Sequence, residues 1–168
     1  MIREEITEDI PEIFEINEAA FGRPQEALLV DRMRARKAIL YSLVAMRDSR
    51  LVGHALFSPI LIYGHNGVVK VVAGLGPVAV LPSYQKQGIG GELINAGIEM
   101  CREAGYPAII VLGHPDYYPH FGFQPAATFG ISSTYDVPDD AFMVLALANG
   151  VGGDLSGVAH YHPEFDGD

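Results

Sequence analysis

The feature that most constrains the fold of this chain is a strand that leads through a glycine-rich loop directly into a helix. An apolar run ends at Pro82, a short polar turn follows, and Gly88, Gly90 and Gly91 open an amphipathic helix predicted over 88–104. The first amides of a helix lack internal acceptors and lie at the positive end of its dipole. Glycines there let the backbone approach an anion. The stretch predicts a cradle for phosphate or pyrophosphate, with a turn needed only for packing as the alternative.

Two well-known phosphate-binding loops do not match this stretch. A Walker A loop needs Gly-Lys-Ser/Thr after its second glycine, whereas Gly90 is followed by Gly91-Glu92. A dinucleotide-binding fingerprint needs glycine at the position of Gln85. The cradle is therefore predicted to be of another kind.

The remaining periodicities predict an α+β (mixed α/β) fold in one domain over 1–168. One helix is expected to begin at a cap formed by Thr7 or Asp9. A second helix is expected over 25–36, with Leu28, Leu29 and Met33 on its apolar side. An antiparallel meander followed by one β-α-β crossover is expected, with strands over 2–6, 41–46, 51–62, 68–81, 108–112 and 142–147. A short helix is expected over 116–121. The turn-rich segment 151–168 is expected to pack on the body as an extension, through Tyr161 and Phe165.

Composition excludes several classes of function. The formal net charge of −10 disfavours a general nucleic-acid or anionic-membrane binder. No uncharged run approaches the roughly 20 residues of a spanning helix, and the charged start Met1–Glu5 does not resemble a signal peptide. One cysteine, Cys101, forms no internal disulfide and is expected in the core. A cytoplasmic protein is the expectation.

Two motifs together resemble those of the GNAT superfamily of N-acyltransferases. Gln85-x-x-Gly88-x-Gly90 behind an apolar strand is similar to the superfamily's acyl-CoA signature, and Tyr118-x-x-x-Gly122-Phe123 is similar to its later tyrosine motif. The segments 111–125 and 141–165 resemble, more closely, the YhbS-like acetyltransferases. The resemblance covers nearly the whole chain. It implies a central mixed, mostly antiparallel sheet that is splayed in the middle and flanked by helices.

The resemblance implies acetyl-CoA as co-substrate and no metal. In that superfamily the strand before the loop opens, and its backbone pairs with the pantetheine arm. A backbone N–H near Val80 would polarise the thioester carbonyl. The implied binding residues are Val78, Ala79, Val80, Gln85, Lys86, Gln87, Gly88, Ile89, Gly90 and Gly91.

The implied reaction is transfer of the acetyl group to a primary amine by direct attack, with both substrates bound together. Tyr118 matches the superfamily tyrosine that hydrogen-bonds the departing sulfur and supplies its proton as general acid. The alternative is a tyrosine packed beside Phe121 and Phe123. Tyr117 is expected to serve packing.

The general base is less defined, because the strand that often carries a glutamate in this superfamily reads Ala73-Gly-Leu-Gly76 here. Glu26 and His114 are the candidates we favour. Asp31, His54 and Asp116, a water relay, and an amine that is already neutral stay open. For each residue a structural role is the competing interpretation.

Other functions also fit the sequence. The sequence also fits a non-catalytic acyl-CoA-binding sensor or interaction module, and an enzyme for a longer acyl-CoA. The acceptor is expected to be a small-molecule or peptide amine, with a lean towards cationic ones from the acidic charge. A homodimer is common in the superfamily and stays open. His160, His162 and Asp166 lack a further ligand at fixed spacing, so no metal site is predicted.

Overall fold

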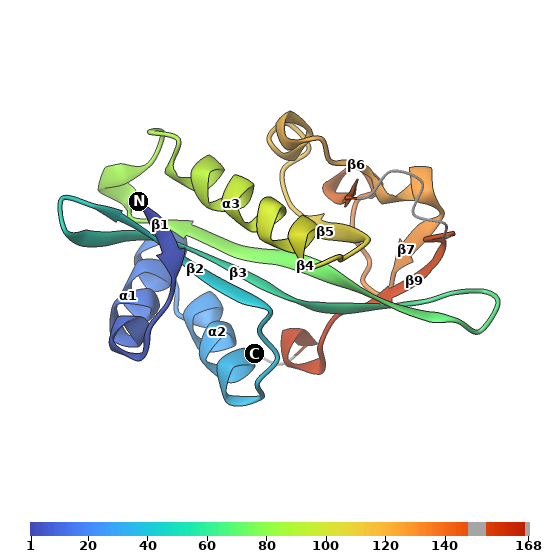
Figure 1. Cartoon of the computed structure of the whole chain (residues 1–168), viewed down its shortest axis with the longest axis horizontal. Helices are drawn as coiled ribbons and strands as arrows, with labels where there is room; N and C mark the ends of the chain where they lie inside the picture. The colour runs from blue at the N-terminus through green and yellow to red at the C-terminus, as the bar shows by residue number, and fades with distance from the viewer. Residues whose placement is uncertain (148–153, 167–168) are drawn as a thin grey trace. The chain divides into compact units, whose positions relative to one another are not determined.

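The computed structural model describes residues 1–147 and 154–166 (Figure 1). Its strands and helices are β1 (Ile2–Glu4), α1 (Ile10–Phe21), α2 (Gln25–Ala35), β2 (Tyr41–Arg47), β3 (Arg50–Tyr63), β4 (Val69–Val80), α3 (Ile89–Glu103), β5 (Ala108–Leu112), β6 (Gln124–Pro125), β7 (Ile131–Ser133), β8 (Phe142–Ala146) and β9 (Gly157–His160). Short 3₁₀ turns cover Thr7–Asp9, Pro82–Tyr84, Tyr118–Phe121, Ala126–Phe129, Asp139–Ala141 and Pro163–Asp166. The α+β class predicted from the sequence is confirmed.

The strands follow the order β1-β2-β3-β4-β5-β8-β6, and β9 joins β3 and β7. Among the registered pairs, β4–β5 and β7–β9 are parallel, and the others are antiparallel. This is the mixed, mostly antiparallel sheet that the sequence predicts. The chain divides into two compact units, the first formed by 1–58, 76–97 and 163–168 and the second by 59–75 and 98–162. Of the predicted C-terminal extension, 151–153 and 167–168 lie outside the described residues.

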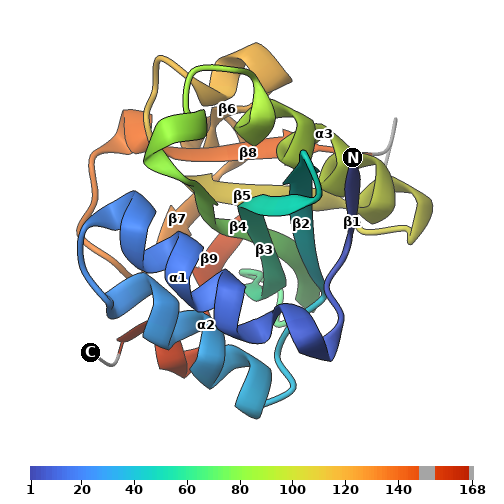
Figure 2. The ribbon, with the colours of Figure 1, turned by 90° about the vertical axis from the view of Figure 1, so that its left-hand side faces the viewer.

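In the first unit, α1 and α2 cover one face of β2 and β3, and the start of α3 covers the other face (Figures 1 and 2). The α1/α2 face buries a core of Ile13, Ile16, Val30, Met33, Ala38, Val44, Leu51, Leu56 and Ala79. On the α3 face, a Cβ added at Gly97 would lie 2.0 Å from the Phe57 ring. Glycine at this position therefore lets α3 lie close against β3.

In the second unit, β5 and β8 pair along their whole length, and their apolar side chains form the core. The core members are Ile60, Ile62, Val72, Ala108, Ile110, Ala126, Ile131, Phe142, Val144, Leu155 and Ala159. Tyr161 packs against this core, whereas Phe165 packs against the core of the first unit. Each unit thus has its own hydrophobic centre.

Two local expectations about the helices are corrected. The buried side of α2 consists of Ala27, Val30 and Met33, and Leu28 is exposed. The apolar residues of this helix fit two different faces, and the face without Leu28 is the one that packs on the core. Asp9 does not cap α1 with its side chain, because that carboxylate binds Arg3 and the Ile6 N–H instead.

Further differences lie at strand and helix ends. The first strand is shorter than predicted, and the predicted helix over 116–121 is a four-residue 3₁₀ turn. The strands β6, β7 and β9 were not predicted. Each has four residues or fewer, so the sequence holds too little periodicity to reveal them.

Candidate functional site

The predicted cradle lies in the first unit, at the junction between β4 and α3. The loop begins with the turn Pro82–Tyr84, and Lys86 and Gly88 take left-handed backbone conformations, with φ of 63° and 82°. A Cβ added at Gly88 would meet nothing within 4 Å, so the space there is open. The positive φ rather than crowding calls for glycine at this position.

The amides at the start of α3 are available to a ligand. The helix begins at Ile89, and the first backbone hydrogen bond of its opening turn runs from the Glu92 N–H to the Gly88 carbonyl at 3.0 Å. The N–H groups of Ile89, Gly90 and Gly91 therefore have no acceptor inside the helix. Together with the helix dipole they form a site for an anion.

The end of β4 presents an open backbone edge next to this cradle. Registered pairing of β4 with β5 covers Ala73, Gly74 and Leu75. On the opposite edge, the Leu81 N–H donates to the Val52 carbonyl at 2.9 Å. Because neighbouring residues of a strand face opposite edges, Val80 and Val78 face away from β3. This agrees with the strand opening predicted for Val78, Ala79 and Val80.

Gln85 ties the cradle loop to that strand. Its Nε2 donates to the Val80 carbonyl at 3.0 Å, so the carbonyl at the open edge is satisfied by the loop. The Val80 N–H lies on the same edge as its carbonyl, beyond the residues of β4 that pair in register with β5. A donor at this position is what the proposed polarisation of a thioester carbonyl requires.

Tyr118 lies in the second unit, at the start of a 3₁₀ turn that ends at Gly122. Its ring lies against the backbone at Gly113, where an added Cβ would be 2.3 Å from the ring. It also contacts the rings of Tyr117 at 5.1 Å and Phe123 at 5.8 Å between centroids. Burial, with a smaller effect of Tyr117, raises the pKa of the Tyr118 phenol to about 12. The phenol therefore keeps its proton at neutral pH, as a proton donor must, and burial makes it a weaker acid than an exposed tyrosine.

The two favoured base candidates are in different surroundings. Glu26, at the start of α2, binds Arg23 at 2.5 Å, and this hydrogen bond outweighs burial and lowers the pKa of the carboxyl group. His114 is exposed, and its carbonyl accepts the N–H groups of Tyr117 and Tyr118. The imidazole of His114 has no hydrogen bond or ion pair within the described part of the chain. Its ring is therefore not held by a partner there, whereas the Glu26 carboxylate is held by Arg23.

Two of the other candidates are engaged within the structure, whereas Asp116 is exposed. Burial lowers the pKa of His54 to about 4, and Asp31 pairs with Arg34 at 3.0 Å. Cys101 is buried, and burial raises the pKa of its thiol to about 12, which fits the predicted core role. Within 1–147 and 154–166 no group of three or more potential metal ligands occurs.

His54 belongs to a buried chain of hydrogen bonds that sequence reasoning did not find. Glu5 is an acceptor only, so the Ser42 hydroxyl donates to it. The Ser42 oxygen then accepts from His54 Nε2 at 2.9 Å, and His54 Nδ1 accepts from the Asn17 amide at 3.1 Å. This fixes one neutral tautomer of the imidazole. This chain of hydrogen bonds ends at Arg34, which binds Glu5 through two nitrogens at 2.8 and 2.9 Å.

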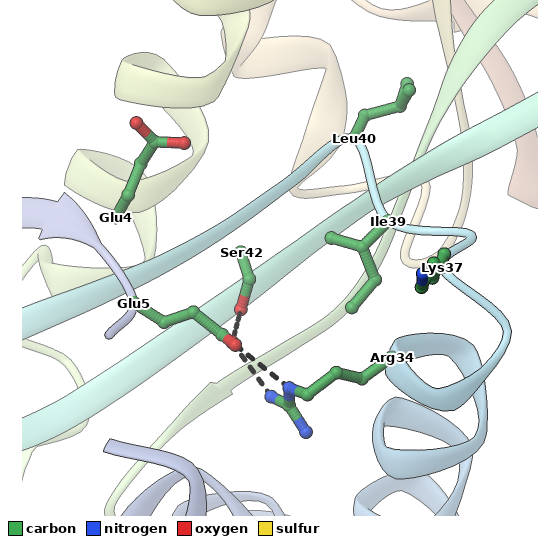
Figure 3. A pocket seen from close by; sticks show the side chains of 7 residues that line it. All are labelled: Glu4, Glu5, Arg34, Lys37, Ile39, Leu40 and Ser42. Atoms are coloured by element: carbon green, nitrogen blue, oxygen red, sulfur yellow. Dashed lines mark hydrogen bonds and ion pairs between the residues drawn. The ribbon is translucent and has the colours of Figure 1, made fainter. Parts of the chain in front are cut away.

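The surface end of this chain borders a cavity of about 300 Å³ that is distinct from the cradle (Figure 3). Figure 3 shows the side chains of Arg34 and Ser42 converging on Glu5. The cavity is lined by Glu4, Glu5, Arg34, Lys37, Ile39, Leu40 and Ser42. No residue of the cradle lines this cavity. The polar side chains at its floor are already hydrogen-bonded to one another.

The comparisons with known proteins give the class of the fold and site. Residues 1–126 match the family model described as an acetyltransferase (GNAT) domain. The chain belongs to the GNAT acetyltransferase family. No helix in the described part of the chain is long and apolar enough to cross a membrane.

Individual relatives are similar over nearly the whole chain. YhbS of Escherichia coli K12, an uncharacterised N-acetyltransferase, is 32% identical over 99% of this chain and 98% of its own length. Its crystal structure in complex with CoA matches with a TM-score of 0.91, covering 99% of this chain and 91% of that one. A GNAT acetyltransferase of Brucella melitensis in complex with acetyl-CoA is 38% identical, with a TM-score of 0.81 and coverage of 99% and 97%. The family predicted from the two motifs is confirmed.

Proposed function

We propose that this protein transfers an acetyl group from acetyl-CoA to a primary amine of a small molecule or peptide, by direct attack in a ternary complex. The observation that carries the proposal is the combination of free amides at the start of α3 with an open, neighbouring edge of β4. These two features fit the pyrophosphate and the amide-containing arm of one ligand. The family membership and the CoA and acetyl-CoA complexes of relatives support the same ligand.

The roles follow from the donors that each element leaves free. The amides from Lys86 to Gly91 hold the pyrophosphate, and the backbone of Val78, Ala79 and Val80 aligns the pantetheine arm. The Val80 N–H stabilises the oxyanion that develops as the amine attacks. The C–S bond then breaks, and Tyr118 donates to the departing sulfur, which leaves as a thiol.

A base must remove a proton from the amine. We propose His114 ahead of Glu26, because the Glu26 carboxylate is already stabilised by Arg23 and is the weaker proton acceptor. A water relay and an amine that is neutral when it binds stay as alternatives.

The single cysteine and the use of acetyl-CoA support action in the cytoplasm.

The test is release of free thiol from acetyl-CoA in the presence of a panel of primary amines, including polyamines and amino-terminal peptides. With an accepted amine, Tyr118→Phe is expected to lower kcat about 100-fold, because the proton donor is lost. Tyr117→Phe is the matched control, since it removes the neighbouring hydroxyl, and it is expected to change kcat less than about threefold.

The outcomes separate the proposal from its main alternative. If acetyl-CoA binds but no amine in a broad panel is acetylated, the protein is a non-catalytic acyl-CoA sensor. If Tyr118→Phe and Tyr117→Phe are equally active, Tyr118 is not the acid. Loss of activity in His114→Gln but not in Glu26→Gln would support the order of the two bases, and the reverse result would overturn it.

A further inference from the structure

The cationic side chains of this acidic protein are distributed unevenly. The chain has 11 lysines and arginines against 21 acidic residues. Most of these cations are held in ion pairs, and Lys70 donates to the Asp154 carbonyl. Within the described residues three have no hydrogen bond or ion pair: Lys37, Arg50 and Lys86. Two of the three, Arg50 and Lys86, belong to the surroundings of the cradle.

Arg50 is held beside the cradle by its position in a hairpin. It is the register partner of Arg47 at the end of β2 and β3, an arrangement of like charges that costs stability. Arg47 pairs with Glu92 in the first turn of α3, which neutralises the one acidic residue of that turn. Arg50 stays unpaired, and its guanidinium carbon lies 6.0 Å from the centre of the Tyr84 ring in the cradle loop. The ring contact keeps the charge at the loop.

Lys86 adds a second free cation two residues along the same loop. It is exposed, and its left-handed backbone places it within the turn that leads to Gly88. Counted with Arg47, Asp48 and Glu92, this region carries one net positive charge in a chain whose net charge is −10. A positive region maintained against that background indicates an anionic ligand.

We propose that Arg50 and Lys86 form a second anion subsite beside the cradle, and that it holds the 3′-phosphate of CoA. The inference rests on the proposed use of acetyl-CoA. CoA carries two separate anionic groups, a pyrophosphate and a phosphomonoester on the ribose. Backbone amides suit the pyrophosphate, whereas the monoester, with a charge of about −1.5 to −2, is bound better by guanidinium and ammonium groups. The protein therefore distinguishes CoA from 3′-dephospho-CoA.

The test is calorimetric titration of the full-length protein with CoA and with 3′-dephospho-CoA at low salt. The native protein is expected to bind CoA about tenfold more tightly, as two partly exposed charge contacts allow. In the double variant Arg50→Gln/Lys86→Gln this ratio is expected to fall below about twofold. The matched control is Lys37→Gln, which removes the third unpaired cation and leaves the ratio near tenfold.

Each outcome decides the proposal. The subsite is supported if the double variant loses the preference and Lys37→Gln keeps it, with the preference weakening as salt is added. It is overturned if the native protein binds both ligands equally, or if the double variant keeps the tenfold ratio. In either of these cases acetyl transfer can still be observed, so the proposed function stands or falls separately. If neither ligand binds the folded protein, the subsite and the proposed function both fail.

Discussion

The first unit contains two polar regions that are built in opposite ways. Under α1 and α2, the chain from Asn17 through His54 and Ser42 to Glu5 is buried, and nearly every donor has an acceptor inside the protein. The Asn17 Oδ1, an acceptor, is buried and has no donor among the described residues. At the cradle the reverse holds, because the first amides of α3 and the Arg50 guanidinium are left free at the surface.

This difference separates polar groups that hold the fold from polar groups that await a ligand. A buried donor without an acceptor costs free energy, so polar groups inside a fold are paired. Donors at the surface are satisfied by water, and a ligand can replace that water at little cost. Changes in the buried chain should therefore affect stability and spare binding, and changes at the cradle should do the opposite.

The largest expected effect on stability is that of His54→Leu. The change leaves Ser42 and Asn17 without their buried partner, and we expect unfolding to become easier by about 4 kcal/mol. Affinity for acetyl-CoA should change less than about twofold. The control is His65→Leu, which changes an exposed histidine and is expected to lower the free energy of unfolding by less than about 0.5 kcal/mol. Chemical denaturation compares the stability of the two variants. Equal stability of the two variants would show that the buried chain does not hold the fold.

Acid should weaken the native protein through the same histidine. The pKa of His54 falls from 6.5 to about 4 on folding, because burial disfavours the imidazolium form. The unfolded chain therefore takes up the proton first, and stability falls as the pH drops from 6.5 towards 4. The loss due to His54 by pH 4.5 should be about 2 to 3 kcal/mol. Glu5 and Glu26, whose pKa values are lowered in the fold, add a smaller loss in the same direction. In His54→Gln, denaturation midpoints over this interval should fall much less than in the native protein, and a slope equal to that of the native protein would exclude His54 as the cause.

A change under the helix that carries the cradle should affect both properties. In Gly97→Ala the new methyl group meets the Phe57 ring, and the crowding should cost about 2 kcal/mol. Displacement of α3 should also weaken acetyl-CoA binding several-fold. Ala96→Ser, one residue away on the same helix and not in that contact, is the control. Unchanged binding in Gly97→Ala would mean that the packing of α3 does not set the cradle.

The smallest effect is expected for Arg47→Gln. The pair of Arg47 and Glu92 is partly exposed, so its loss should cost under about 0.5 kcal/mol of stability. The freed Glu92 carboxylate at the start of α3 should weaken acetyl-CoA binding about threefold at low salt. The double variant Arg47→Gln/Glu92→Gln should restore the affinity for acetyl-CoA, which calorimetric titration can measure. A single variant with native affinity would show that Glu92 does not influence the ligand.

The cradle could be predicted from the sequence because its determinants are contiguous. Strand, loop and helix follow one another from Val78 to Gly91, and glycine spacing and helix capping are local signals. The family resemblance then added Tyr118, which physical reasoning alone would have left as a packed aromatic residue. The Gly113 backbone beneath its ring is consistent with either interpretation.

The buried chain could not be predicted, because its members come from elements far apart in the sequence. Asn17 lies 37 residues from His54, and only the pairing of β2 with β3 brings Ser42 to the other side of the imidazole. The partner of Arg50 in the hairpin was equally hidden, since it depends on the exact register. Sequence patterns give faces and local turns, whereas the contacts that join them need the tertiary fold.

The most direct test of the account is calorimetric titration of acetyl-CoA into the native protein and into Gly90→Glu and Gly90→Gln. A glutamate in the first turn favours the helix, so Gly90→Glu should fold normally while its charge repels the pyrophosphate. The account predicts micromolar binding by the native protein, a loss of about 100-fold or more in Gly90→Glu, and a clearly smaller loss in Gly90→Gln. Native affinity in Gly90→Glu would contradict the claim that the start of α3 holds the ligand.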